Sequence, residues 1–231
     1  MANQLSDLQA NKNRICLIHY ACTDISKMPI KIPCIAVAEY ANRKLRVFAE
    51  MEGKNEEDVL REFYDFVAHN FNYIYVGWNF KGVTYGLPVI ERRYKELFKK
   101  KPSEINLVFD LDDILEQVYG RQYVDHGTFG KLHNLLTLND ISTKNFIDGK
   151  TEAELCEKND LRPVERSTES KVHGMVGILD LLFSGKLKTS KQSKVRKLIY
   201  KIENSTIYKL ACIIAVIITI LGAYWLLKLI T

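Results

Sequence analysis

The side chains in this sequence that suit metal-dependent hydrolysis are Asp24, Asp110, Asp180 and His173. Carboxylates are the ligands that Mg²⁺ and Mn²⁺ prefer, and two such cations held side by side can activate a water molecule and stabilise a leaving oxygen. Asp112 and Asp113 follow Asp110, but they begin a predicted helix, where the helix dipole favours acids without any metal. Two interpretations stay open: an active site rebuilt from scattered acids with Mg²⁺ or Mn²⁺, and a site with no metal and no cofactor.

A second set of side chains suits binding. It combines a histidine, two aromatic rings, an amide and four cations, and its members are His19, Trp78, Asn79, Tyr85, Arg92, Arg93, Lys99 and Lys100. Aromatic rings stack on nucleic-acid bases, and basic side chains follow phosphates. The alternative for the cations is a solvated helix face, and the alternative for His19 is a satisfied polar residue at a strand end. Nucleic acid and a cytosolic protein are the two candidate partners.

The hydrophobic pattern predicts one α/β domain that positions these side chains. Alternating apolar residues predict strands at 15–21, 32–40, 44–50 and 73–78, and a fifth that ends at Asp110. Helical spacing and capping residues predict helices at 55–71, within 79–102, after Asp110, at 127–139, from about Thr151, and at 167–183. The predicted order is β-β-β-α-β-α-β-α-α-α.

This order and the residues that fill it resemble the ribonuclease H-like fold, in particular its DEDD branch of proofreading-type 3′-5′ exonucleases. The stretch "RICLIHYACTD" is similar to the family's first motif, a strand that carries Asp-x-Glu. "YIYVGWNFKGVTYGLPVIERR" is similar to the second motif, and "STESKVHGMVGILDLL" to the last helix, which supplies a histidine and the final aspartate. The resemblance implies a mixed sheet, with three antiparallel strands followed by two parallel ones and helices on its faces.

The motifs match the family in shape and differ from it in chemistry. His19 and Ala21 occupy the Asp-x-Glu positions, Asn79 keeps the asparagine of the second motif, and Val83 stands near its aspartate. Asp180, with His173, is what remains of the third motif. Four carboxylates hold two cations in this family, and one carboxylate cannot. The resemblance therefore implies a catalytically degenerate domain.

The end of the chain differs from the rest in composition. Residues 210–227 carry no charge, and a run of this length suffices to cross a hydrocarbon core of about 30 Å. We expect a transmembrane helix at 210–228, a basic amphipathic juxtamembrane segment at 186–209, an exonuclease-like domain at 14–185 and a polar tail at 1–13. The excess of lysine before the apolar run predicts a single-pass protein of the cell membrane, in contact with lipid, whose amino-terminal domain is cytoplasmic.

Small side chains recur at intervals of four within the apolar run, at Ala211, Ala215, Thr219 and Ala223. A stripe of this kind lets helix backbones approach closely, so it predicts a homo-oligomer. The alternative is a chance pattern in an alanine-rich segment.

Composition limits the classes of partner and of metal site that this chain can have. A net charge of +5 allows an anionic partner without the basic density of a dedicated nucleic-acid binder, and five cysteines without a Cys-x-x-Cys pair predict reduced thiols rather than a zinc site. We expect a tail-anchored binding or sensing module coupled to membrane oligomerisation, the build of a bacterial anti-phage or stress effector. The rival is an active membrane-bound 3′-5′ exonuclease, and a third reading is a structural scaffold.

Overall fold

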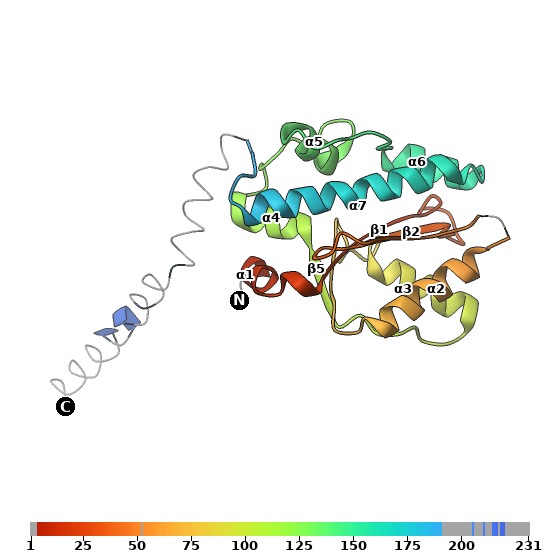
Figure 1. Cartoon of the computed structure of the whole chain (residues 1–231), viewed down its shortest axis with the longest axis horizontal. Coiled ribbons are helices and arrows are strands. Elements are labelled where there is room, and N and C mark those ends of the chain that lie inside the picture. Colours follow the sequence, from red (N-terminus) through yellow and green to blue (C-terminus); the bar gives the residue numbers. More distant parts are fainter. Residues whose placement is uncertain are drawn as a thin grey trace, which may run out of the picture.

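Five strands form one mixed sheet at the centre of the protein. A computed structural model of the chain describes residues 4–51 and 53–190 and, further along, residues 205, 210, 214–216, 218 and 219 (Figure 1). The strands are β1 (Ile15–Ala21), β2 (Cys34–Glu39), β3 (Leu45–Ala49), β4 (Ile74–Gly77) and β5 (Leu107–Asp110). Their order across the sheet is β3-β2-β1-β4-β5. The β1–β2 and β2–β3 pairs are antiparallel, and the β1–β4 and β4–β5 pairs are parallel. The predicted mixed sheet is confirmed.

Helices cover both faces of this sheet. The early helices are α1 (Gln4–Ala10), the short 3-10 turn η1 (Lys12–Arg14), α2 (Glu56–His69) and α3 (Leu87–Phe98). The later ones are α4 (Leu111–Tyr119), α5 (Gly130–Leu138), α6 (Gly149–Glu157) and α7 (Leu161–Phe183). Figure 1 shows α2 and α3 on one face, and α5, α6 and α7 on the other. The central strand β1 is buried along its whole length because both of its faces are covered.

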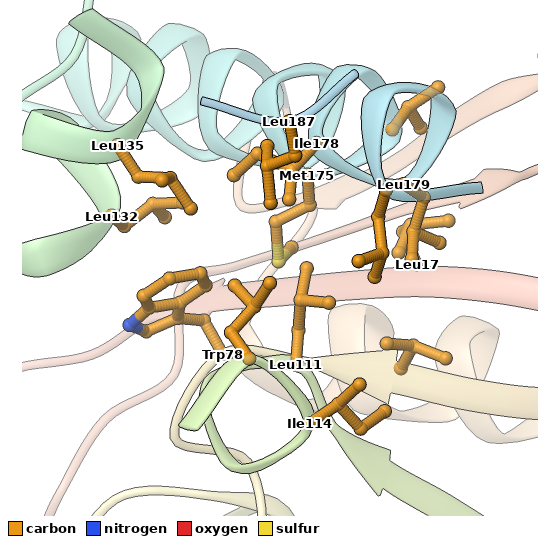
Figure 2. Close-up of a cluster of buried hydrophobic side chains, with 14 of the residues drawn as sticks. Leu17, Trp78, Leu111, Ile114, Leu132, Leu135, Met175, Ile178, Leu179 and Leu187 are labelled. Atoms are coloured by element: carbon orange, nitrogen blue, oxygen red, sulfur yellow. The ribbon is translucent and has the colours of Figure 1, made fainter. Parts of the chain in front are cut away.

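Alternation along β1 divides its side chains between two apolar cores. Ile15 and Leu17 belong to the core under α7, whereas Cys16, Ile18 and Tyr20 belong to the core over α2 and α3. Successive side chains of a strand point to opposite faces, so His19 and Ala21 lie on the α7 face with Leu17. Figure 2 shows Leu17, Trp78 and Leu111 facing Met175 and Leu179 of α7 across this core.

The first residues, expected to be a polar tail, form α1, and its Leu8 is fully buried in the core under α7. At the other end of the domain, chain contacts continue past residue 185. Leu187 joins the same core, and the backbone N–H of Lys188 donates to Asn139 Oδ1 at 2.7 Å. The packed unit therefore includes residues at both ends that the sequence assigned to flanking segments.

The transmembrane helix is a correction to the predicted fold. Most of 210–228 lies outside the described residues, and within the part that the structure does describe, no helix is long and apolar enough to cross a bilayer. The longest described helix, α7, has 23 residues, but it is amphipathic and packs against β1 and β2. A spanning helix needs about 20 consecutive apolar residues, and the charges on α7 interrupt any such run.

The predicted oligomerisation stripe is described only in part. Ala211 and Ala223 lie outside the described residues. Ala215 and Thr219 are helical, and the Thr219 hydroxyl donates to the Ala215 carbonyl at 2.9 Å. Beyond Ser190, the basic segment falls almost wholly on residues outside the description. Membrane attachment, location and homo-oligomerisation stay predictions.

Asn55 begins α2 with a reciprocal capping box. Its side chain accepts from the backbone N–H of Asp58, whose carboxylate accepts from the N–H of Asn55, both at 3.1 Å. Replacing Asn55 with alanine is expected to lower the free energy of unfolding by about 1 kcal/mol, because an exposed helix end loses an acceptor. Urea denaturation followed by circular dichroism measures the change. A loss above about 3 kcal/mol would contradict a purely local cap.

Candidate functional site

A cavity of about 730 Å³ opens where β1 and β4 end. Its walls come from the residues after these two strands and from α5, α6 and α7. β1 and β4 are parallel neighbours, so their carboxyl ends meet at the same edge of the sheet. Four of the predicted binding residues line this cavity: His19, Trp78, Asn79 and Tyr85. Ala21 also lines the cavity, so both residues at the positions that resemble the Asp-x-Glu motif, His19 and Ala21, are part of its lining.

Packing positions the aromatic walls. Trp78 directly follows β4 and is mostly buried in the core under α7. Tyr85 stacks on the ring of Tyr20, with centroids 4.6 Å apart, and donates its hydroxyl proton to the Tyr20 carbonyl at 2.7 Å. Phe129, just before α5, also lines the cavity and is 50% exposed. The cavity is therefore lined by the largely buried Trp78, by Tyr85 and by the half-exposed Phe129.

Three charged or titratable side chains form the floor of the cavity, and we call them the floor cluster: His19 of β1, Glu152 of α6 and Lys171 of α7. Each is less than a tenth exposed. Lys171 Nζ donates to Glu152 Oε2 at 2.7 Å, and His19 Nε2 lies 4.0 Å from the same oxygen, too far for a hydrogen bond. His19 Nε2 and Glu152 Oε1 are buried without a hydrogen-bond partner among the described residues.

The floor cluster has a defined charge state near neutral pH. Burial lowers the pKa of His19 and outweighs the neighbouring Glu152 carboxylate, which raises it, so the imidazole is neutral near pH 7. Burial also opposes ionisation of Glu152, but the Lys171 ammonium, 2.7 Å from the carboxylate, outweighs burial and holds the pKa of that carboxyl below its usual range. The floor therefore presents a carboxylate with an ammonium 2.7 Å from it and a neutral ring 4.0 Å from it.

Cys22 lines the same cavity without the properties of a nucleophile. Burial raises its pKa to about 12, and Glu152 adds to the shift. The thiolate is the reactive form of cysteine, so this thiol is inert at neutral pH.

Asp110, a candidate catalytic acid, has a structural role at the end of β5. It is buried and caps α4 by accepting from the N–H of Asp112 at 3.0 Å. It also accepts from the N–H groups of Asn79, Phe80 and Lys81, at 3.2, 2.6 and 3.3 Å. Burial raises its pKa, and these N–H donors oppose the shift. Its carboxylate holds the turn after β4 and is not part of the cavity lining.

This turn places Asn79 at the cavity. Its backbone has a positive φ of 51°, a left-handed conformation that asparagine tolerates better than most residues. Val83, near the expected aspartate of the second motif, is 76% exposed and lies outside the cavity lining.

The remaining candidate acids do not converge. Asp180 accepts from the Tyr40 hydroxyl and from Arg43 Nη2, both at 2.7 Å. The N–H of Tyr40 bonds to the carbonyl of Ile15 at the start of β1, and Ile15 is four residues, about 13 Å along the strand, from His19. Asp180 is therefore bound to a residue that pairs with the opposite end of β1 from the cavity. His173 is exposed on α7.

Asp24 does reach the cavity, but as part of its rim. It accepts from the N–H and hydroxyl of Ser26, and Lys27 Nζ lies 3.6 Å from it. Asp112, also in the lining, accepts from the Tyr123 hydroxyl and has Lys131 Nζ at 3.5 Å. Each of these rim carboxylates is already paired within the protein.

The predicted basic residues lie elsewhere. Arg92, Lys99 and Lys100 are exposed on or just after α3, on the opposite face of the sheet from α7, and none lines the cavity. Arg93 forms a bidentate pair with Glu56, at 2.9 and 2.6 Å, which ties α3 to α2. The structure thus separates this basic set from the four cavity residues.

Sequence reasoning missed Glu152 and Lys171. A signal for Lys171 was present, because it continues the buried stripe of α7 formed by Val164, Thr168, Met175 and Ile178 at spacings of three and four. A charged residue on the buried side of a helix needs a partner. Glu152 carried no comparable signal.

Comparisons with models of known protein families and with curated protein sequences found no match for this chain. Among the described residues, no group of three or more His, Cys, Asp or Glu side chains lies close enough to hold a metal ion.

Proposed function

We propose that this chain is a binding module that holds a nucleotide, free or at the end of a single strand, in the cavity without cleaving it. The observation that carries the proposal is the floor cluster, which lies among aromatic side chains and includes His19, one of the two residues at positions that resemble the Asp-x-Glu motif. The order of strands and helices supports the same resemblance. Membrane coupling and a defence role are not part of this proposal, because they depend on residues outside the described ranges.

The floor cluster suits binding better than metal-dependent hydrolysis. An exonuclease of the resembled family uses cations to neutralise acids at this place. Here the Lys171 ammonium neutralises Glu152 through a 2.7 Å contact. A metal ion entering beside this ammonium would meet like charge, and Asp110 and Asp180 are bound to other groups.

The aromatic side chains that line the cavity also support nucleotide binding. Trp78, Tyr85 and Phe129 line the cavity with ring surface, and stacking of a base on an aromatic ring contributes about 1–3 kcal/mol without regard to sequence. A volume of about 730 Å³ lies in the range of small-molecule and cofactor sites.

Oligonucleotides are expected to survive incubation with the full chain. Single-stranded DNA and RNA decamers with Mg²⁺ or Mn²⁺ should remain intact on a denaturing gel, whereas the Trp78 fluorescence should be quenched by the same oligomers and by nucleoside monophosphates. The fluorescence change should disappear in Trp78→Phe protein, and calorimetry should still detect binding there.

Two results would overturn the proposed function. The first is strand degradation that is lost in Asp112→Asn or Asp24→Asn protein, since these changes remove a carboxylate with little change of shape. The second is the absence of calorimetric binding for every nucleotide and oligomer at millimolar concentration.

A further inference from the structure

The strand β3 has an open outer edge. It is the first strand in the order β3-β2-β1-β4-β5, so β2 is its one neighbour in the sheet that the structure describes. The N–H of Glu50, directly after β3, donates to the Pro33 carbonyl at 2.9 Å. Residues of an antiparallel strand bond alternately to its two sides, so the N–H and C=O groups of Leu45, Val47 and Ala49 are directed away from β2. A row of unpaired backbone groups of this kind is a template for a further strand.

A groove of about 410 Å³ lies beside this edge, between β3 and α2. It is lined from β3 by Arg46 and Phe48, and from α2 by residues that include Glu62 and Asp65. Glu62 is paired with Lys54 at 2.6 Å, whereas Asp65 is exposed and forms no ion pair within the described part of the chain. The groove therefore offers a carboxylate to a cation that arrives along the edge of β3.

The stretch "KLRVFAE" complements itself when two copies run antiparallel with Val47 at the centre. Lys44 then stands opposite Glu50 of the other copy. Arg46 stands opposite Phe48, so no two like charges face each other. The remaining cross-strand pairs are apolar, and they lie on the face covered by α7. Charges on an edge strand ordinarily oppose pairing, but this order of charges permits it in one register.

We propose that β3 pairs antiparallel with β3 of a second copy of this chain, around a two-fold axis at Val47. The two sheets then join into one continuous sheet, and each outward-facing residue of β3 donates one hydrogen bond and accepts one across the axis. Arg46 of the second copy enters the groove beside Phe48, where Asp65 is its counter-ion. This inference is independent of the proposed nucleotide binding, because no residue of β3 lines the cavity.

Sedimentation velocity of the full chain over a series of concentrations tests the association, and the expected result is a monomer–dimer equilibrium. Asp65→Lys protein should dimerise at least about tenfold more weakly, because the new cation faces Arg46 of the second copy. The matched control is Glu104→Lys, which makes the same change of charge at an exposed residue before β5, at the opposite edge of the sheet. Its dimer should be as stable as that of the unaltered chain.

Spin labels on Lys44→Cys protein test the register through the distance between the two labels. Lys44 is exposed and lies three residues before Val47, so the two labelled positions should be six residues, about 20 Å, apart along the paired strands. A register shifted by two residues would change this separation to about 13 or 27 Å. The unaltered chain treated with the same label is the control for its own cysteines, four of which are buried.

Two results would overturn the proposal. A chain that stays monomeric at millimolar concentration would leave the edge of β3 to a strand of a different protein. A dimer without the expected distance between labels at position 44 would show that the copies meet at another surface. Neither result depends on the folding of Asp65→Lys protein. If folded Asp65→Lys and Glu104→Lys proteins dimerised equally well, the assignment of Asp65 as the counter-ion of Arg46 would be wrong.

Discussion

Replacing Lys171 with methionine is expected to lower the free energy of unfolding by about 3–5 kcal/mol at pH 7, because it leaves Glu152 as an uncompensated charge in the interior. Both side chains are 5% exposed, and their contact is 2.7 Å. Methionine fills nearly the same volume, so packing changes little. Urea denaturation of the full chain, followed by circular dichroism, measures the difference.

An exposed ion pair supplies the control. Lys54 lies 2.6 Å from Glu62, but both side chains are more than two-fifths exposed. Replacing Lys54 with methionine should cost at most about 1 kcal/mol, because water solvates the glutamate that remains. Equal losses in the two variants would contradict the assignment of Lys171 as the counter-ion of a buried acid.

The pH dependence of the Lys171→Met difference has a definite sign. In the unaltered protein the pKa of Glu152 is below its usual range, so its contribution to stability is complete above the unfolded pKa of about 4.3 and is lost as the pH falls through the folded value. Without Lys171, burial remains as the main influence and raises the folded pKa of Glu152. In the Lys171→Met variant, Glu152 therefore favours the folded state in its protonated form, and that contribution to the free energy of unfolding is lost as the pH rises.

The variant is therefore expected to recover part of its deficit between pH 7 and pH 5. His19 is buried in its neutral form, so the unaltered protein also loses stability as the pH falls below about 6.5. In the variant, a proton taken up by either His19 or Glu152 reduces the uncompensated charge. Both effects narrow the difference on acidification, and a constant difference from pH 7 to pH 5 would contradict the charge argument.

Replacing Asp110 with alanine is expected to lower the free energy of unfolding by about 3 kcal/mol, because backbone donors at the end of β4 and at the start of α4 lose a shared acceptor. The shortest of these bonds joins Phe80 N to Asp110 Oδ2 at 2.6 Å. The turn at Asn79 would loosen with it, so ligand affinity should fall as well. Thermal unfolding and calorimetry measure the two effects.

Asp148 is the matched control for this change, since it is also an aspartate that caps a helix. It accepts from the N–H groups of Lys150 and Thr151 at 3.1 Å, but it is partly exposed and holds no second segment. Asp148→Ala should cost about 1 kcal/mol. If Asp110→Ala protein kept full stability and lost a nuclease activity instead, Asp110 would be a catalytic acid rather than a structural one.

The sequence by itself determined the sheet and one half of the cavity. Alternation over 15–21 located β1, and the capping residues from Asn55 located α2. Residues that follow β1 and β4 gather because parallel neighbours end at one edge, so His19, Trp78, Asn79 and Tyr85 could be assigned from strand positions alone. The strand and the helix cap depend on residues close in sequence, whereas the parallel pairing of β1 with β4 was expected from the resemblance to the ribonuclease H-like order.

Only the tertiary structure determined the other half of the cavity, which Glu152 and Lys171 supply. Glu152 and Lys171 are 19 residues apart, and each becomes meaningful through the other and through His19, more than 130 positions earlier. The direction of α7 across the sheet then separates Lys171 from Asp180: nine residues of helix span about 13 Å, which carries the aspartate to the opposite end of β1. Residue types along a chain do not specify how a helix crosses a sheet, because packing of the whole core sets that crossing. In this fold the crossing of α7 places Lys171 at the cavity, where the sequence had led us to expect Asp180.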